Sequence, residues 1–281
     1  MGPTPVDGHE PLHARTPDDA RPALASSRRG KGPVVVLAHG FTQTRNVWGP
    51  LADDLAADHE VVALDLPGHG ESHAVETDLV AGAELMAEAG GRGTYIGYSM
   101  GARYCLHVAL AHPELVTSLV LISGTAGIDD DGERAARRQA DERLADELDP
   151  PAGGGPGLPL DVFLDRWLSQ PLFAGLDPDA AGAAERRANH PAGLASSLRH
   201  AGTGTQRPRW HELDRLTMPV VIVTGERDQK YCDLGRRMAR AIGPAARHVV
   251  VPGAGHAPHL ERPSAVIAAV RELTPGTDPG N

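Results

Sequence analysis

The pentapeptide Gly97-Tyr98-Ser99-Met100-Gly101 constrains this chain more than any other segment. It has the pattern G-x-S-x-G, and it lies between a strand-like run at residues 94–96 and a helix-like run at 102–111. A strand that turns sharply into a helix places the serine at the tip of a strained elbow, where the helix N-terminus points its dipole at the hydroxyl. Ser99 is therefore predicted to act as a nucleophile or a base.

The pattern alone is weak evidence, because glycine and serine are common in turns, so the surrounding elements have to support it. Strands are predicted at the apolar runs 34–37, 61–66, 95–97, 119–122, 220–223 and 248–251. Helices are predicted at 48–57, 79–89, 102–111, 233–241 and 264–273. This alternation is typical of the α/β class, with a mostly parallel sheet flanked by helices.

The alternation of strands and helices breaks between residues 125 and 208. Helical stretches are predicted there at 132–148, 160–168 and 180–189, with a Gly/Pro-rich loop at 150–159. We interpret this region as a helical cap, inserted after the central strands and covering the sheet edge where open α/β sheets bind ligands. The core is then divided between residues 33–124 and 209–273.

Composition narrows the function classes. The net charge of −10 argues against a nucleic-acid partner. Neither a secretory apolar segment nor a run long enough to span a membrane is found, and the two cysteines lie far apart, so a cytoplasmic location is expected. Residues 1–32 are predicted to be largely disordered with a weak strand at 11–15, and 274–281 to be a loose tail.

A serine hydroxyl is a poor nucleophile at neutral pH, so it needs a base, and the base needs a carboxylate to orient it. Asp228 follows the strand predicted at 220–223, and His256 follows the strand predicted at 248–251. The carboxyl ends of parallel strands meet at one edge of the sheet. Ser99, Asp228 and His256 are therefore expected to meet there as a catalytic triad.

Each member of this triad has a competing interpretation. Asp228 could instead cap a loop, and Glu226 is a rival acid closer to its strand. His256 has a rival in His259, and the two histidines could suggest a metal site. Since no third ligand of suitable spacing accompanies them, no metal is expected.

Two backbone N–H groups are candidates for an oxyanion hole. The strand at 34–37 runs into residues 38–41 (AHGF), so the N–H of Phe41 and that of Met100 could point at a developing negative charge. The alternative for residues 38–41 is an ordinary strand-to-helix turn. Residues 66–70 (LPGHG) are interpreted as a Pro-Gly turn that shapes the same sheet edge.

Across residues 33–273 the sequence resembles the α/β-hydrolase superfamily, whose triad follows the order serine, acid, histidine. Within it, the chain is similar to the family of the menaquinone-pathway lyase 2-succinyl-6-hydroxy-2,4-cyclohexadiene-1-carboxylate synthase. The matching segments are HGFT at 39–42 with Trp48, DLPGHG at 65–70, GYSMGAR at 97–103, GERAAR at 132–137, WLSQPLF at 167–173, RAN at 187–189, GLASSLR at 193–199, GTGTQ at 202–206 and GERDQKY at 225–231. The superfamily motifs are widely shared, and the cap motifs are the specific part. The long N-terminal extension and the insertion at 150–159 depart from the pattern.

The resemblance implies a substrate with several carboxylates, which loses pyruvate by elimination. Guanidinium groups suit such a ligand because each holds a carboxylate through two parallel hydrogen bonds. The candidates are Arg103, one helical turn beyond the serine, Arg134 and Arg137 on one helix face, and Arg187 from another cap helix. Each could instead be a solvated surface charge.

Tyr98 and Trp167 are candidates for the ring-binding part of the pocket, with core packing as the alternative. In the implied reaction, Ser99 takes a proton from the substrate ring, and no metal or organic cofactor is required. One alternative function is a serine hydrolase, meaning a carboxylesterase, lactonase or carbon–carbon bond hydrolase. A second is a ligand-binding protein that has lost the chemistry. The arginines discriminate, because neutral esters do not need them.

Overall fold

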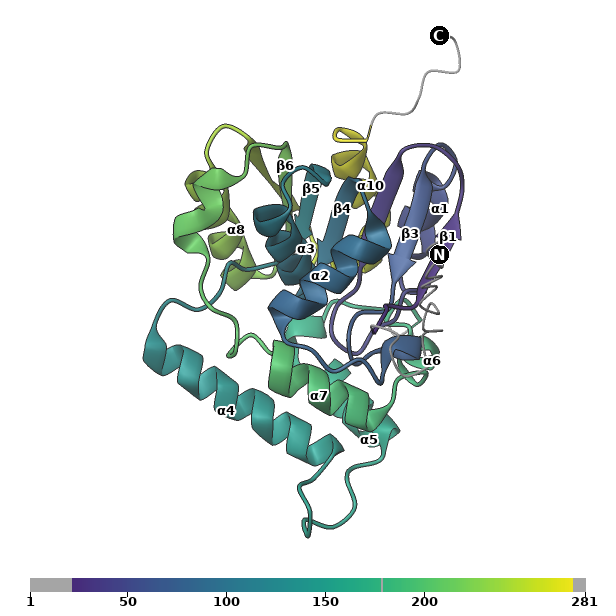
Figure 1. Ribbon diagram of the computed structural model, residues 1–281, viewed down its shortest axis with the longest axis vertical. Coiled ribbons are helices and arrows are strands. Elements are labelled where there is room, and N and C mark those ends of the chain that lie inside the picture. Colours follow the sequence, from purple (N-terminus) through teal and green to yellow (C-terminus); the bar gives the residue numbers. More distant parts are fainter. Residues whose placement is uncertain (1–21, 178, 275–281) are drawn as a thin grey trace, which may run out of the picture.

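Valine- and leucine-rich runs form the centre of the fold. The computed structural model describes residues 22–177 and 179–274, with a seven-stranded sheet in the order β1-β3-β2-β4-β5-β6-β7 (Figure 1). Neighbouring strands are parallel, except that β1 is antiparallel to β3. The strands are β1 (Ser26–Arg29), β2 (Val34–Ala38), β3 (Glu60–Leu64), β4 (Gly93–Tyr98), β5 (Val116–Ile122), β6 (Val220–Gly225) and β7 (Ala246–Val251).

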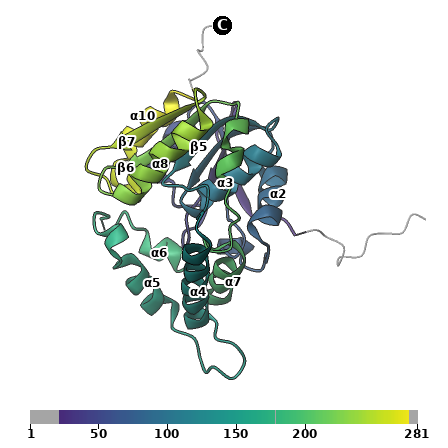
Figure 2. The same ribbon diagram turned by 90° about the vertical axis from the view of Figure 1, so that its left-hand side faces the viewer.

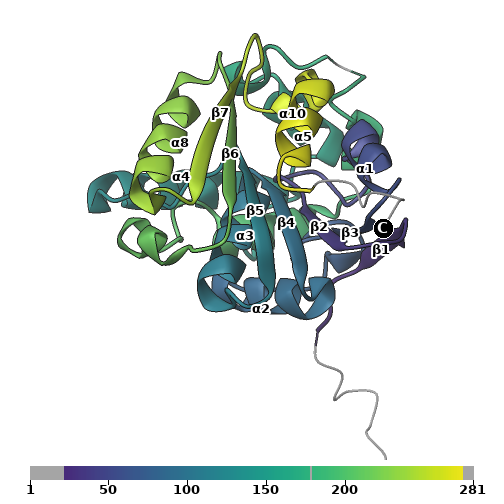
Figure 3. The same cartoon turned by 90° about the horizontal axis from the view of Figure 1, so that it is seen from above.

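Side chains of β2 alternate between two cores, one on each face of the sheet. Val36 and Ala38 pack into one core, and Val35 and Leu37 into the other, as the period of two in a strand requires. One face is covered by α2 (Leu79–Gly90), α3 (Met100–Ala111) and α8 (Gln229–Ile242), and the other by α1 (Gly49–Leu55) and α10 (Pro263–Arg271) (Figure 3). The predicted α/β-hydrolase architecture, a mostly parallel sheet flanked by helices, is confirmed.

Four α-helices among the described residues between β5 and β6 lie together beyond one end of the sheet (Figures 1 and 2). They are α4 (Asp131–Leu148), α5 (Leu160–Leu168), α6 (Ala183–Arg186) and α7 (Pro191–Ala201). We call this region, residues 125–208, the cap. It has a small apolar core of its own, in which Leu148, Phe163 and Leu194 are buried. Short turns complete the fold: η2 (Gly70–Ser72), η3 (Pro171–Phe173), η4 (Trp210–Arg215) and α9 (Pro258–Glu261).

Two sequence predictions are wrong in this region and at the N-terminus. The helix expected at 180–189 is limited to the four residues of α6, because Pro191 begins a new helix, α7, and holds the preceding His190 in an extended conformation. Residues 26–29 are not disordered, since they form β1 through backbone pairing with β3, although all four side chains are exposed. The weak strand at 11–15 and the tail beyond residue 274 lie outside the described residues.

Within residues 22–177 and 179–274, none of the helices combines the length and the apolar character that crossing a membrane requires.

The helix α3 packs unusually close to β2. A Cβ atom on Gly101 would lie 1.9 Å from Ala38 O and 2.7 Å from His39 O, and both neighbours are backbone atoms that cannot rotate away. We therefore expect Gly101→Ala to lower the free energy of unfolding by about 2 kcal/mol or more in urea denaturation. The control is Gly132→Ala, on the exposed first turn of α4, which should be neutral or stabilising by up to ~1 kcal/mol. Equal effects of the two substitutions would contradict the packing argument.

Candidate active site

Ser99 lies at a strained turn between β4 and α3. Its backbone has φ 52° and ψ −104°, a combination that residues other than glycine rarely adopt. Two features hold it there: the N–H of Ser99 donates to Ile122 O at 2.8 Å, and Gly97 packs so close that an added Cβ would lie 2.4 Å from Gly101. The predicted elbow is present, and it directs the Ser99 side chain into a pocket.

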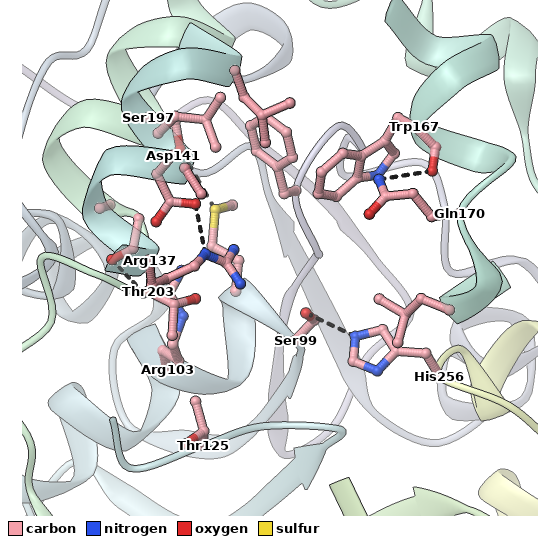
Figure 4. Close-up of a pocket in the computed structure, with 18 of the residues that line it drawn as sticks. Ser99, Arg103, Thr125, Arg137, Asp141, Trp167, Gln170, Ser197, Thr203 and His256 are labelled. Carbon is pink, nitrogen blue, oxygen red and sulfur yellow. Dashed lines mark hydrogen bonds and ion pairs between the residues drawn. The ribbon is translucent and has the colours of Figure 1, made fainter. Parts of the chain in front are cut away.

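The structure brings the three predicted triad residues together. Ser99 Oγ lies 3.1 Å from His256 Nε2 (Figure 4), and His256 Nδ1 lies 2.6 Å from Asp228 Oδ2. Asp228 is fixed at the start of α8, where its other oxygen accepts the N–H of Tyr231 at 3.3 Å. With Nδ1–H donated to the carboxylate, Nε2 is left to accept the serine proton. This geometry permits the catalytic roles predicted from the sequence.

The two rival residues lie elsewhere. Glu226 is exposed and accepts the N–H of Gly253 at 2.8 Å, away from the serine. His259 is buried between the rings of Tyr98 and Trp48, with centroid distances of 4.3 Å and 5.3 Å. Because its ring is enclosed by aromatic packing, His259 serves the core behind the site and does not compete with His256 for the serine.

Phe41 and Met100, the residues proposed to form the oxyanion hole, both line the pocket beside Ser99. Met100 is the first residue of α3, so its N–H has no acceptor within the helix. The turn at 66–70 shapes the same edge: His69 lies behind Phe41, and burial lowers its pKa to about 3. A neutral His69 can accept the N–H of Thr42, at 3.3 Å, and so helps to hold the loop.

The pocket has a volume of about 280 Å³ and is lined by residues of both the core and the cap. One wall is aromatic: Trp167 lies 5.0 Å from Phe41 between ring centroids, and Tyr98 and Phe173 also contribute. The other wall carries charge. In Figure 4, Arg103 and Arg137 lie on the side opposite His256, with Ser99 between them.

Three guanidinium groups reach this pocket from three different helices. Arg103 of α3 is buried and donates to Gly202 O at 3.4 Å; burial lowers its pKa, but an arginine stays protonated. Arg137 of α4 donates from Nε to Asp141 at 2.7 Å. Arg186 of α6 donates from Nε to Ala181 O at 2.8 Å, and burial lowers its pKa to about 10. Three arginine side chains from three helices thus line one small cavity.

Two of the predicted substrate-binding arginines lie outside the pocket. Arg134, near the N-terminus of α4, donates to Ile128 O at 3.0 Å and pairs with Asp131. Arg187 is paired at 2.5 Å with Asp161 on the surface. Arg134 lies one turn too early in α4 to reach the cavity, and Arg187 follows α6 on its outward side. The prediction that these two arginines line the substrate pocket is therefore wrong.

Comparison with known proteins agrees with the fold. Residues 35–270 match the model of the alpha/beta hydrolase family. A Bacillus subtilis (strain 168) protein, provisionally named 2-succinyl-6-hydroxy-2,4-cyclohexadiene-1-carboxylate synthase, is 33% identical over 88% of this chain and 92% of its own length. The synthase of that name from Enterobacter sp. (strain 638) is 30% identical over 88% and 94%. The chain belongs to the alpha/beta hydrolase family.

Within this family the resemblance to the synthases, inferred from the cap motifs, is confirmed. The solved structure of MenH from S. aureus superposes with a TM-score of 0.79 at 25% identity, covering 88% of this chain and 97% of that one. The relatives therefore match the cap as well as the core, and the cap supplies two of the three pocket arginines.

For this family member, several pocket residues were missed by the sequence analysis. Arg187 was predicted as the substrate-binding residue in place of its neighbour Arg186, because an Arg-Arg pair does not show which side chain points into the pocket. Tyr231 lies 4.4 Å from His256 between ring centroids, and burial raises the pKa of its phenol. Gln170 also lines the pocket, and its side chain donates to Trp167 O at 3.1 Å. The motifs at 167–173 and 225–231 contain both residues, so the signal was present without an assigned role.

The burial of His259 predicts a pH-dependent stability. Neither ring nitrogen has a hydrogen-bond partner among the described residues, and burial, with the charges of His256 and Arg186, lowers its pKa from 6.5 to about 3. Below pH 6.5 the unfolded chain binds a proton there that the folded chain does not, so stability is lost as the pH falls. Between about pH 7.5 and 5, the free energy of unfolding of the wild type should fall by about 2 kcal/mol more than that of His259→Leu. Urea unfolding at the two pH values measures this difference.

His211→Leu is the matched control, because that side chain is 70% exposed and its replacement should leave the pH profile unchanged. An unaltered profile in His259→Leu would contradict the lowered pKa of His259 in the folded protein.

Proposed function

We propose that this chain is the lyase that forms 2-succinyl-6-hydroxy-2,4-cyclohexadiene-1-carboxylate by eliminating pyruvate from a polycarboxylated cyclohexene. The observation that carries the proposal is the charge of the pocket. Arg103, Arg137 and Arg186 line the cavity that contains Ser99 and His256, and Asp141 is the one carboxylate among its described lining residues. Asp141 already pairs with Arg137, which leaves a clear excess of positive charge for the substrate.

The first step is a proton transfer within the triad. Asp228 holds the Nδ1–H of His256, so Nε2 can take the Ser99 proton while the serine oxygen takes a proton from the substrate ring. The carbon–hydrogen electrons move into the ring, and the carbon–oxygen bond to the departing pyruvate group breaks. The N–H groups of Phe41 and Met100 hold the negative charge that develops on a substrate oxygen.

The arginines fix the substrate for this step. A guanidinium binds a carboxylate through two parallel hydrogen bonds, and such bonds strengthen where water is excluded. Arg103 is buried, with 5% of its surface exposed, so a charge at this position without an anionic partner would cost free energy. Trp167, Tyr98 and Phe173 line the other side of the cavity, where a carbocycle can pack.

A serine hydrolase with the same triad is the main alternative, and a binding protein without chemistry is a second. Both would keep the fold, since one scaffold supports many reactions. The cluster of arginines favours the lyase over an esterase or lactonase for neutral substrates, which do not require three cations. The strained elbow and the hydrogen-bonded triad favour an enzyme over a binding protein.

The state of the cysteines bears on the cellular location of the protein. Cys105 and Cys232 are buried free thiols, which suits a reducing compartment, and we infer a cytoplasmic enzyme acting on a small-molecule substrate.

The direct test is to supply the menaquinone-pathway intermediate and to measure pyruvate with a coupled dehydrogenase. Wild-type protein should release pyruvate, and Ser99→Ala should be slower by about 10³-fold or more, because the triad acts as a unit. Circular dichroism establishes that both proteins are folded. A folded wild type that releases no pyruvate would exclude the lyase activity.

A matched arginine pair tests the role of the pocket. Arg103→Met keeps the volume of the buried side chain and removes its charge, so the KM for the substrate should rise by about tenfold or more. Arg134→Met removes an arginine of the same helical cap that pairs with the exposed Asp131 and does not line the pocket, and its KM should stay within about twofold. Similar KM values for the two variants would assign Arg103 to structure.

A further inference from the structure

The loop that carries Phe41 has a conformation that needs outside support. Thr42, the next residue, has a φ of 67°, which is rare for a β-branched side chain. Such a backbone persists only where its surroundings hold it. Part of that support comes from the core, where Gln43 Oε1 accepts the N–H of Gly40 at 2.9 Å and His69 accepts the N–H of Thr42.

The rest of the support for Thr42 comes from the cap. Its carbonyl oxygen accepts a hydrogen bond from Asn189 Nδ2 at 2.8 Å, and its hydroxyl oxygen accepts one from Arg186 Nη1. Arg186 Nη1 also lies 3.4 Å from Phe41 O. The N–H, the carbonyl and the hydroxyl of Thr42 are therefore all engaged, and two of the three partners lie in the four-residue cap segment 186–189.

Asn189 contacts a second core loop as well. It is 4% exposed, its Oδ1 accepts the N–H of Gly70 at 2.9 Å, and its Nδ2 also donates to Arg186 O at 3.0 Å. A side-chain amide supplies a donor and an acceptor from one planar group, which a carboxylate or a hydroxyl of this length cannot match here. Asn189 thus links the loop at 40–42, the loop at 66–70 and the cap.

We propose that Asn189 is a positioning residue that fixes the loop at 40–42, so that the N–H of Phe41 points at the developing negative charge. The inference rests on the proposed oxyanion role of Phe41, and it adds a contribution of the cap to that role. Asn189 does not touch the reacting atoms; it acts through the carbonyl of Thr42. Because an oxyanion donor must lie within about 3 Å of its target, a small shift of this loop weakens it.

The test uses a fluorophosphonate probe, which reports on the site whatever the natural substrate is. Ser99 Oγ forms a bond to phosphorus, fluoride leaves, and the serine proton passes to His256. Negative charge develops on the phosphoryl oxygen, where the oxyanion donors act. The labelling rate of full-length protein is followed by intact mass, and unfolding temperatures are measured in parallel.

Asn189→Ala should slow labelling by about tenfold or more at a temperature where the variant is folded. The matched control is Asn46→Ala: Asn46 also joins the core to the cap, through a bond from Nδ2 to Glu185 at 3.2 Å, but it is exposed and does not bond to residues 40–42. Its labelling rate should stay within about twofold of wild type. Folded Asn189→Ala that labels as fast as wild type would overturn the proposal.

Asn189→Asp provides a second variant. It keeps an acceptor for the N–H of Gly70 but loses the donor to Thr42 O, so its labelling should be as slow as that of Asn189→Ala. A wild-type rate in this variant, or loss of folding in both variants, would assign Asn189 to stability alone and overturn the inference. Absence of pyruvate release with normal wild-type labelling would count against the lyase activity and not against this role of Asn189. Absence of wild-type labelling would count against the nucleophilic site on which both rest.

Discussion

The contact between α3 and β2 is the constraint on which the rest of the site depends. A side chain on Gly101 would collide with Ala38 of β2, and one on Gly97 of β4 would collide with Gly101, so a side chain fits at neither position. This close approach turns the chain abruptly at Ser99 and places the serine beside the ends of the neighbouring strands. The base and its carboxylate then arrive from β7 and β6, because parallel strands present their carboxyl ends at one edge.

The elbow and the triad can serve many reactions, whereas the cap contributes residues that are specific to this pocket. Arg137 and Arg186 come from the cap, and only Arg103 belongs to the core. Arg103 and Arg186 are buried, so their charges are less screened by water. The triad thus belongs to the core, whereas the pocket arginines come from both the core and the cap.

The sequence predicted most of the core, because buried parallel strands and amphipathic helices leave strong periodic signals. The strand β1 was missed since its four exposed side chains, SSRR, carry no such signal and its pairing is purely through the backbone. The triad was predictable because strand ends fix where its residues meet. The inward turn of Arg186 was not, since it depends on how a four-residue helix rests on Thr42, which is a tertiary contact.

The division of the arginines between two parts of the chain has a thermodynamic consequence. A ligand whose carboxylates contact Arg103 on one side and Arg137 or Arg186 on the other bridges the core and the cap. Its binding free energy is then shared with the docking of the cap, and by linkage each process strengthens the other. A pocket assembled in this way also joins the core to the cap, and this connection is strongest when a ligand is bound.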